Sequence, residues 1–324
     1  MVKERRFWVA TTIVSLAAVL VLASCSGSTS SPPAEEAPQA TTGENETSDG
    51  AVVEPLPIGD YLFDLETGET AALPSSVAGG GYCIHASPDG SRITFHVDNP
   101  EKGAIFYVAN VDGSDAQVIS AKGVPDGAEV RCPDWSPDGT KIVYQTTVQP
   151  PKSENLFIYD LTSGETTQIS HLKPNRDGGW MNPTFTADGQ SVLFHRAGVT
   201  GLDLWSVPAT GGEPFLVQKD AAYGVASPNG TEIAFVRGVS SYTGSQISMA
   251  TFGSADPPRT LVEGPDLGWP RVSPDGSKIV YIDSGKVFVM DLSSEQGTRV
   301  GDLTVNQFGV ADWFDDHTLI IDRY

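Results

Sequence analysis

Apolar and polar residues alternate in short runs along most of this chain, and one run recurs. The stretch "DWSPDGTKIVY" at 134–144 reappears almost unchanged as "RVSPDGSKIVY" at 271–281. Proline fixes φ at one corner of a turn, aspartate bonds back to the backbone, and glycine accepts a positive φ. The residues that follow alternate in the manner of a strand. Each copy therefore predicts a strand, a tight turn and a second strand.

The repeat has a period that is typical of a propeller or solenoid. Degenerate copies of the repeat occupy 86–95, 185–194 and 226–235, and a sixth copy begins at Trp313. Successive turns are separated by 49, 50, 41, 46 and 41 residues, which lies in the range expected for such folds. A second hairpin follows, most clearly at 156–169, so each period predicts one four-stranded blade. No reactive side chain recurs, and we interpret the repeat as scaffold.

A half-blade stands at each end of the repeat region. "DLETGET" at 64–70 matches "DLTSGET" at 160–166, but no first hairpin precedes it. The segment 312–324 is a first hairpin with no second one after it. If the two halves share one sheet, the exposed sheet edges disappear. We therefore predict an all-β fold, a six-bladed β-propeller closed by N-terminal strands that complete the C-terminal blade.

The repeats resemble those of a known family. "WSPDGTKIVY" and its copies are similar to the Pro-Asp repeat of TolB-type β-propellers, whose WD-like blades also occur in the non-catalytic domain of prolyl oligopeptidase relatives. The resemblance covers 58–324 and implies the fold, whereas function stays open because propellers host many activities. TolB-type proteins carry an α/β domain before the propeller, and only a low-complexity segment stands there, so their partners are not implied. No Gly-x-Ser-x-Gly elbow occurs, which argues against a peptidase.

The first residues have the layout of a bacterial lipoprotein signal. A basic start precedes an apolar run at 7–23, and "LASC" at 22–25 resembles the lipobox, which would place a diacylglyceryl group on Cys25. An uncleaved anchor or an ordinary signal is the alternative. Residues 26–57 contain almost no large apolar side chain and predict a disordered tether. The predicted organisation is a signal peptide at 1–24, the lipidated Cys25 with its tether at 25–57, and the propeller at 58–324.

Charge restricts the partners of this protein. Its 41 acidic and 20 basic residues give a net charge of −21, so nucleic acid is not an expected partner. The acidity also keeps an exposed protein soluble. The five histidines lack metal-ligand spacing, so we expect no metal and no cofactor.

Two cysteines occupy equivalent positions in adjacent predicted blades. Cys83 and Cys132 each stand four residues before the serine of the repeat. Outside the cytoplasm two such thiols favour a disulfide. The alternative is two separate buried thiols.

Ionisable and aromatic residues gather where the inner strands of the predicted blades meet. The position two before the repeat serine holds an ionisable residue in four consecutive blades, and three aromatic residues are predicted around the same mouth. A polar ligand or an ion-pair network would explain the charges, and the aromatics would bind a partner if exposed or fill the channel if buried. The candidate ligand-binding mouth comprises His85, Asp134, Trp180, Tyr223, Trp269, Arg271 and Asp312.

Together these features predict a membrane-tethered, extracytoplasmic β-propeller lipoprotein that acts as a binding or assembly module of the bacterial cell envelope. The expected protein is a monomer, and its partner is an envelope protein, peptide or glycan. Two alternatives stay open. One is a propeller enzyme, a lyase or glycan-active protein, with Asp134, His85 and Asp312 as acid and base. The other is a structural accessory of a transporter or sensor.

Overall fold

The computed structural model describes residues 60–73, 83–99, 103–119, 129–148, 153–172, 181–198, 201–240, 243–305 and 311–322. The chain divides into two units, Met1–Val53 and Glu54–Tyr324, and all described residues belong to the second. The predicted signal peptide, Cys25 and the tether lie outside the described residues. Within the described ranges, no helix has the length and apolar character that crossing a membrane requires.

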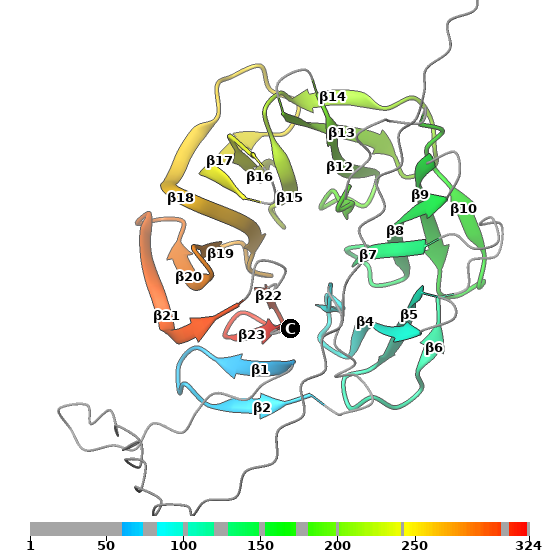
Figure 1. The fold of residues 1–324 in the computed structure, drawn as a ribbon, viewed down its shortest axis with the longest axis horizontal. Helices are drawn as coiled ribbons and strands as arrows, with labels where there is room; N and C mark the ends of the chain where they lie inside the picture. Colours follow the sequence, from blue (N-terminus) through cyan, green and yellow to red (C-terminus); the bar gives the residue numbers. More distant parts are fainter. Residues whose placement is uncertain are drawn as a thin grey trace, which may run out of the picture. The chain divides into compact units, whose positions relative to one another are not determined.

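Each element in the described ranges is a β-strand, and four of the sheets have four strands (Figure 1). Central strands such as β12, β16 and β19 are buried in continuous runs, because neighbouring sheets cover both of their faces. Three of these sheets run in chain order from the inside of the ring outward. They contain β3(His85–Ala86), β4(Arg92–Asn99), β5(Gly103–Asn110) and β6(Gln117–Val118); β7(Glu129–Trp135), β8(Lys141–Val148), β9(Ser153–Asp160) and β10(Thr166–Gln168); and β11(Thr184–Phe185), β12(Ser191–Ala197), β13(Leu202–Pro208) and β14(Phe215–Gln218).

The fourth four-stranded sheet joins the two ends of the repeat region, as the two half-blades predict. Its order is β2-β1-β23-β22, with Tyr61 opposite Ile321 and Phe63 opposite Leu319. The strands are β1(Tyr61–Asp64), β2(Thr70–Ala72), β22(Ala311–Trp313) and β23(Thr318–Ile321). The N-terminal strands thus complete the sheet that the C-terminal strands begin.

The strands of the two remaining predicted blades form one seven-stranded sheet. The 14-residue strand β18 pairs with β17 through its first part and with β19 through Leu267 to Val272. It runs without interruption from one predicted blade into the next, so the two are hydrogen-bonded together. The sheet consists of β15(Ala222–Ala226), β16(Glu232–Arg237), β17(Gly244–Thr251), β18(Arg259–Val272), β19(Lys278–Asp283), β20(Lys286–Asp291) and β21(Gln296–Thr304).

The inner strands form a closed cycle of contacts in the order β3, β7, β11, β15, β18, β22 and back to β3. In Figure 1 the sheets stand around a common centre. Six apolar clusters fill the spaces between neighbouring members of this cycle. Burial of these clusters supplies the main driving force for the propeller-like arrangement.

The recurrent turns form a second cycle at one end of the inner strands. In the turn that follows β7, the Ser136 hydroxyl donates to Asp138 at 2.6 Å and accepts from the Lys141 amide at 2.9 Å. Gly139 has a φ of 66°, and a Cβ placed there would lie 3.8 Å from Pro88 of the preceding turn. Gly189 packs in the same way on Pro137. The repeated phrase therefore builds the turns and packs each one on its neighbour.

Candidate functional site

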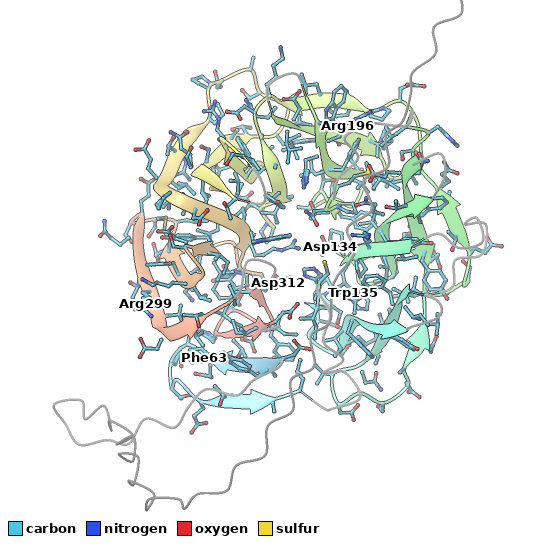
Figure 2. All side chains as sticks on the ribbon, viewed as in Figure 1. Phe63, Asp134, Trp135, Arg196, Arg299 and Asp312 are labelled. Atoms are coloured by element: carbon cyan, nitrogen blue, oxygen red, sulfur yellow. The ribbon has the colours of Figure 1, made fainter. Side chains whose placement is uncertain are left out.

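Four ionisable side chains meet inside the ring, each two residues before the serine position of its turn. We call them the axial quartet: His85 on β3, Asp134 on β7, Arg271 on β18 and Asp312 on β22. In Figure 2, Asp134 and Asp312 lie close to the centre of the ring, at the inner ends of their sheets. The structure therefore brings together all four charged residues that the sequence placed at the mouth.

The quartet is a connected network. His85 Nδ1 lies 2.5 Å from Asp312 Oδ2. The guanidinium of Arg271 lies 3.8 Å from Asp312 Oδ2 and 3.9 Å from Asp134 Oδ2, and its Nη2 is 3.4 Å from His85 Nε2. A single arginine thus contacts side chains from three other inner strands.

Burial and pairing set the protonation states of the quartet. Burial and the nearby Arg271 both lower the pKa of His85, but hydrogen bonds with Asp312 and Cys83 outweigh them and raise it to about 9. Burial raises the pKa of Asp312, but the Arg271 charge and the His85 hydrogen bond more than compensate and lower it. Burial dominates at Asp134 and raises its pKa. At neutral pH the quartet therefore contains two cations and one firmly ionised carboxylate.

Two tryptophan side chains hold the backbone of the quartet in place. The Trp135 indole donates to the His85 carbonyl at 3.1 Å, and the Trp313 indole donates to the Arg271 carbonyl at 2.9 Å. Each bond joins neighbouring inner strands. The side chain of His85 is 3% exposed, whereas that of Asp134 is 18% exposed. The quartet thus connects the sheets and leaves only a small part of Asp134, Asp312 and Arg271 exposed.

The predicted aromatic residues occupy another layer of the inner strands. Tyr223 is buried and Trp269 is half-buried, and their rings pack with centroids 4.6 Å apart. His195 packs edge-on against Tyr223 at 4.8 Å. Trp180 lies outside the described residues. The sequence analysis assigned no role to His195. Its only signal was that His195 follows Thr186 at the same spacing at which His96 follows Ser87.

A backbone feature at this layer has no counterpart in the sequence prediction. The residue four before the turn serine or threonine has a positive φ in four repeats: 74° at Cys83, 39° at Asn182, 54° at Tyr223 and 52° at Trp269. A positive φ costs free energy for a non-glycine residue, most of all for a bulky one. Register shifts beside Tyr223 and Trp269 show that these residues lie in bulges. Bulges re-aim side chains at the rims of closed sheets.

The predicted cysteine bridge stays a prediction. Cys83 is buried and its side chain is hydrogen-bonded with His85. The Cys132 side chain is outside the part that the structure describes. Among the described residues, no group of three or more His, Cys, Asp or Glu is placed to hold a metal ion.

Comparison with known proteins gives one family and one relative of known name. A family model described as the TolB beta propeller domain matches residues 83–312. The Tol-Pal system protein TolB of Methylobacillus flagellatus is 26% identical over 118 residues, which are 36% of this chain and 22% of that protein. This chain therefore spans less than a quarter of the length of that relative.

Two solved structures share the fold. TolB from Acinetobacter baumannii superposes with a TM-score of 0.53 at 18% identity, over 77% of this chain and 65% of that one. Hydrazine synthase of Kuenenia stuttgartiensis superposes with a TM-score of 0.57 at 16% identity, over 82% of this chain and 47% of that one. At these identities the likeness concerns the fold alone.

Proposed function

The chain belongs to the TolB β-propeller domain family, and from this premise we propose that it is a lipid-anchored binding module of the bacterial cell envelope. The anchor is Cys25 and the spacer is the segment 25–57, both proposed from the sequence. The propeller begins at residue 58. We count the seven-stranded sheet as two blades that meet within β18, which gives six blades in total.

The pairing of the axial quartet carries the proposal of binding rather than catalysis. The groups that could transfer a proton already contact one another: His85 is buried between Asp312 and Arg271. A general base must reach the proton it removes from a substrate. The partly exposed side chains of Asp134, Asp312 and Arg271 can instead contact a polar group of a partner. A rigid ring that presents fixed charges is suited to recognition without chemical change.

The proposed partner is an envelope protein, peptide or glycan. The relative from Methylobacillus flagellatus is named as a protein of the Tol-Pal system, and by analogy we favour a protein partner. We expect the protein to act as a monomer on the extracytoplasmic side of the membrane. The net charge of −21 favours basic groups in the partner.

One observation favours an enzyme as the second candidate function. His85 and Asp312 form an imidazole–carboxylate pair at 2.5 Å, and Arg271 lies beside it. Such a set can provide an acid, the protonated His85, and a positive charge for an acidic substrate. Turnover of a glycan or lactone panel that disappears in His85→Gln would establish this alternative.

The proposed anchor and the proposed binding site require separate tests. In membrane fractionation, Cys25→Ala should move the protein out of the membrane fraction, and a processed variant that stays with the detergent phase would contradict the anchor. For binding, crosslinking in intact envelopes followed by affinity recovery should capture a specific partner. Asp134→Asn and Trp180→Ala should each reduce its recovery. Unchanged recovery in both variants would remove the axial mouth as the binding site.

A further inference from the structure

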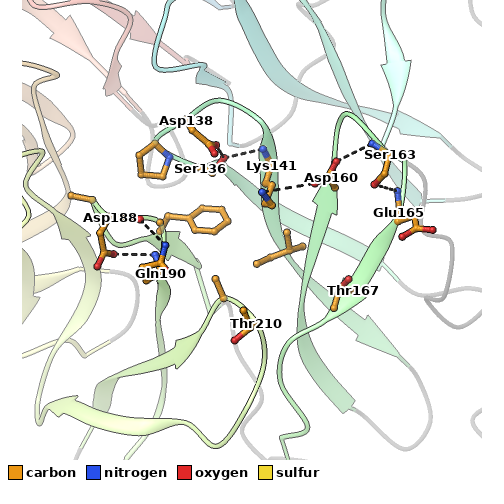
Figure 3. A pocket seen from close by; sticks show the side chains of 16 residues that line it. Ser136, Asp138, Lys141, Asp160, Ser163, Glu165, Thr167, Asp188, Gln190 and Thr210 are labelled. Atoms are coloured by element: carbon orange, nitrogen blue, oxygen red, sulfur yellow. Dashed lines mark hydrogen bonds and ion pairs between the residues drawn. The ribbon is translucent and has the colours of Figure 1, made fainter.

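A groove separates the β7–β10 sheet from the β11–β14 sheet at the end of the ring that carries the turns (Figure 3). Its volume is about 790 Å³. The floor is apolar and includes Ile158, Phe185 and Ala209, whereas carboxylates surround the opening. These are Asp138, Asp160, Glu165 and Asp188, against one cation, Lys141. The groove is thus acidic at its rim and apolar at its base.

The preceding junction shows how this protein fills the equivalent space. Arg92, five residues after Ser87, extends from the β3–β6 sheet toward the β7–β10 sheet. Its guanidinium lies 5.0 Å from the ring centroid of Trp135 and donates to the Gly139 carbonyl at 2.8 Å. Trp135 immediately precedes the turn serine, and Gly139 is the turn glycine. An arginine that stacks on an aromatic ring and bonds to a turn carbonyl therefore closes this junction.

At another junction a lysine at the same position also bonds to the next turn. Lys278, five residues after Ser273, donates to the Asp316 carbonyl at 3.1 Å, in the turn between β22 and β23. The cation of one sheet again bonds to the turn of the next. A cation at this position therefore bridges two junctions of the ring.

At the groove, the equivalent cation turns back onto its own sheet. Lys141, five residues after Ser136, has its amine 3.8 Å from Asp160 Oδ2 on β9 and 3.5 Å from the Thr140 hydroxyl. Figure 3 shows Lys141 directed toward Asp160, with Asp188 on the other side of the groove. The counterparts of Trp135 and Gly139 are Phe185 and Gly189, and both line the groove. The groove is thus the space that the arginine fills in the preceding junction.

We propose that this groove binds an arginine side chain of a partner polypeptide, placed over Phe185 and directed to the Gly189 carbonyl as Arg92 is placed over Trp135. A planar guanidinium stacks on an aromatic ring and donates in several directions, which an ammonium group does less well. The apolar floor accepts the methylene groups of the side chain. This inference goes beyond the axial site and is independent of it.

The rim carries the negative charge that such a ligand requires. Hydrogen bonds from Ser136 and from Thr140 lower the pKa of Asp138 to about 2. A hydrogen bond from Thr186 lowers the pKa of Asp188. Each of these aspartates uses Oδ1 within its turn, so Oδ2 can face the ligand. A carboxylate on each side of the groove favours a basic segment over a neutral or acidic one.

The test uses the full chain with labelled isoleucine and alanine methyl groups and the peptide Ac-Gly-Ser-Arg-Ala-Gly-NH2. NMR titration should give saturable shifts at Ile158, Ala187 and Ala209, which line the groove. Peptides with citrulline in place of arginine should bind at least about tenfold more weakly, because the charge-assisted bonds are lost. Lysine in place of arginine should bind several-fold more weakly. Equal affinities of the arginine and lysine peptides, or of the arginine and citrulline peptides, would overturn the proposal.

Two sets of variants test whether peptide binding depends on the groove. The double variant Asp138→Asn with Asp188→Asn should bind the arginine peptide about tenfold or more weakly than the parent protein does. Asparagine preserves the turn, because Asn229 accepts from Thr231 at 3.0 Å in the equivalent turn after β15. Asp89→Asn, at the same turn position away from the groove, is the matched control and should change affinity less than about twofold. Equal affinities in the double variant and the control would contradict the proposal, whereas Asp134→Asn tests the axial site separately.

Discussion

The guanidinium of Arg271 lies 3.9 Å from the carboxylate of Asp134, although β18 and β7 stand on opposite sides of the cycle of inner strands. The same guanidinium lies 3.8 Å from Asp312. Arg271 therefore crosses the axis of the ring and links three inner strands. Because its side chain is only 14% exposed, these interactions are poorly screened by solvent.

Replacing Arg271 should destabilise the fold. Arg271→Ala leaves the carboxylates of Asp134 and Asp312 close together without their shared cation. Removing one partner of a largely buried ion pair costs about 3–5 kcal/mol in the free energy of unfolding. Urea unfolding of the variant and the parent protein at pH 7 measures this loss.

Arg299→Ala provides the control for Arg271→Ala. Arg299 pairs with Asp302 at 3.2 Å, but the two side chains are 39% and 89% exposed. Such a surface pair contributes less than about 1 kcal/mol. If the two variants lose equally little stability, Arg271 does not link the sheets. A loss of partner recovery in Arg271→Ala at unchanged stability would then assign it to binding.

The sequence predicts the fold through local rules. Ser-Pro-Asp-Gly specifies the turn wherever it stands, and the two unmatched hairpins at 64–70 and 312–324 specify the closing sheet. The charged residues of the quartet were also found by position within the repeat. The sequence did not predict their mutual contacts, because whether Arg271 reaches across the axis depends on how closely the inner strands approach one another.

The sequence analysis did not predict the features that depend on exceptions to the repeat. The positive φ four residues before the turn serine or threonine falls on Cys83, Asn182, Tyr223 and Trp269, which share no side-chain chemistry. The groove exists because Lys141 turns toward Asp160, and the same position bridges the junction in the other repeats described above. β18 joins two predicted blades even though it contains Gly264, Pro265 and Asp266, a combination typical of a turn. In each case the cause is a tertiary contact that the repeat pattern does not encode.

Removing the closing strands should prevent cooperative folding. A chain that begins at Ser75 lacks β1 and β2, so β23 keeps β22 but loses its other partner, and an edge of the sheet becomes exposed. The buried side chains of Tyr61 and Phe63 are lost from the cluster that also contains Trp313. We expect aggregation or a broad, non-cooperative thermal transition measured by circular dichroism.

Deleting residues 26–54 is the control for this truncation. It removes the predicted tether and leaves β1 in place, so the melting temperature should stay within about 1–2 °C of the parent value. A cooperative transition at the parent temperature in the chain that begins at Ser75 would show that the closing strands are dispensable.

The turn hydroxyl should contribute measurably to stability. Ser136→Ala removes the donor to Asp138 and the acceptor for the Lys141 amide, and we expect a loss of about 1–2 kcal/mol in urea unfolding. Ser136→Thr should preserve most of this stability, because Thr186 makes the same two bonds at 2.7 and 3.0 Å in the next repeat. Equal losses in both variants would mean that the bonds are not what stabilises the turn.

The closing sheet also contains a buried pair of carboxyl groups. Asp60 precedes β1 and Asp322 follows β23, and the register of Tyr61 with Ile321 places them opposite each other. Asp60 is 8% exposed and Asp322 is fully buried. Burial, opposed by a hydrogen bond between the two side chains, raises the pKa of Asp60 to about 6. Burial and the neighbouring Asp60 raise the pKa of Asp322 well above its usual range.

This pair should make the closure less stable as the pH rises. In the unfolded chain an aspartate releases its proton near pH 4, whereas in the folded protein Asp60 keeps its proton to about pH 6. The folded state therefore binds more protons between these values, and its stability falls as the pH increases through this window. Asp322 adds to the fall, because burial and the neighbouring Asp60 raise its pKa as well. Above the window the folded state carries like charges at the join between β1 and β23.

Asp60→Asn should remove much of this penalty. The amide cannot ionise and can still donate to Asp322, so the variant should exceed the parent protein in free energy of unfolding by about 1–3 kcal/mol at pH 8. The difference should shrink toward zero near pH 4, where the parent pair is protonated. Asp302→Asn, a substitution at an exposed aspartate, should shift stability by less than about 0.5 kcal/mol at either pH. Urea unfolding across pH 4 to 8 measures all three proteins. If Asp60→Asn is less stable than the parent at pH 8, the pair holds the closing sheet together rather than repelling across it. A difference in free energy of unfolding that is the same at pH 4 and pH 8 would show that ionisation of Asp60 does not cause it.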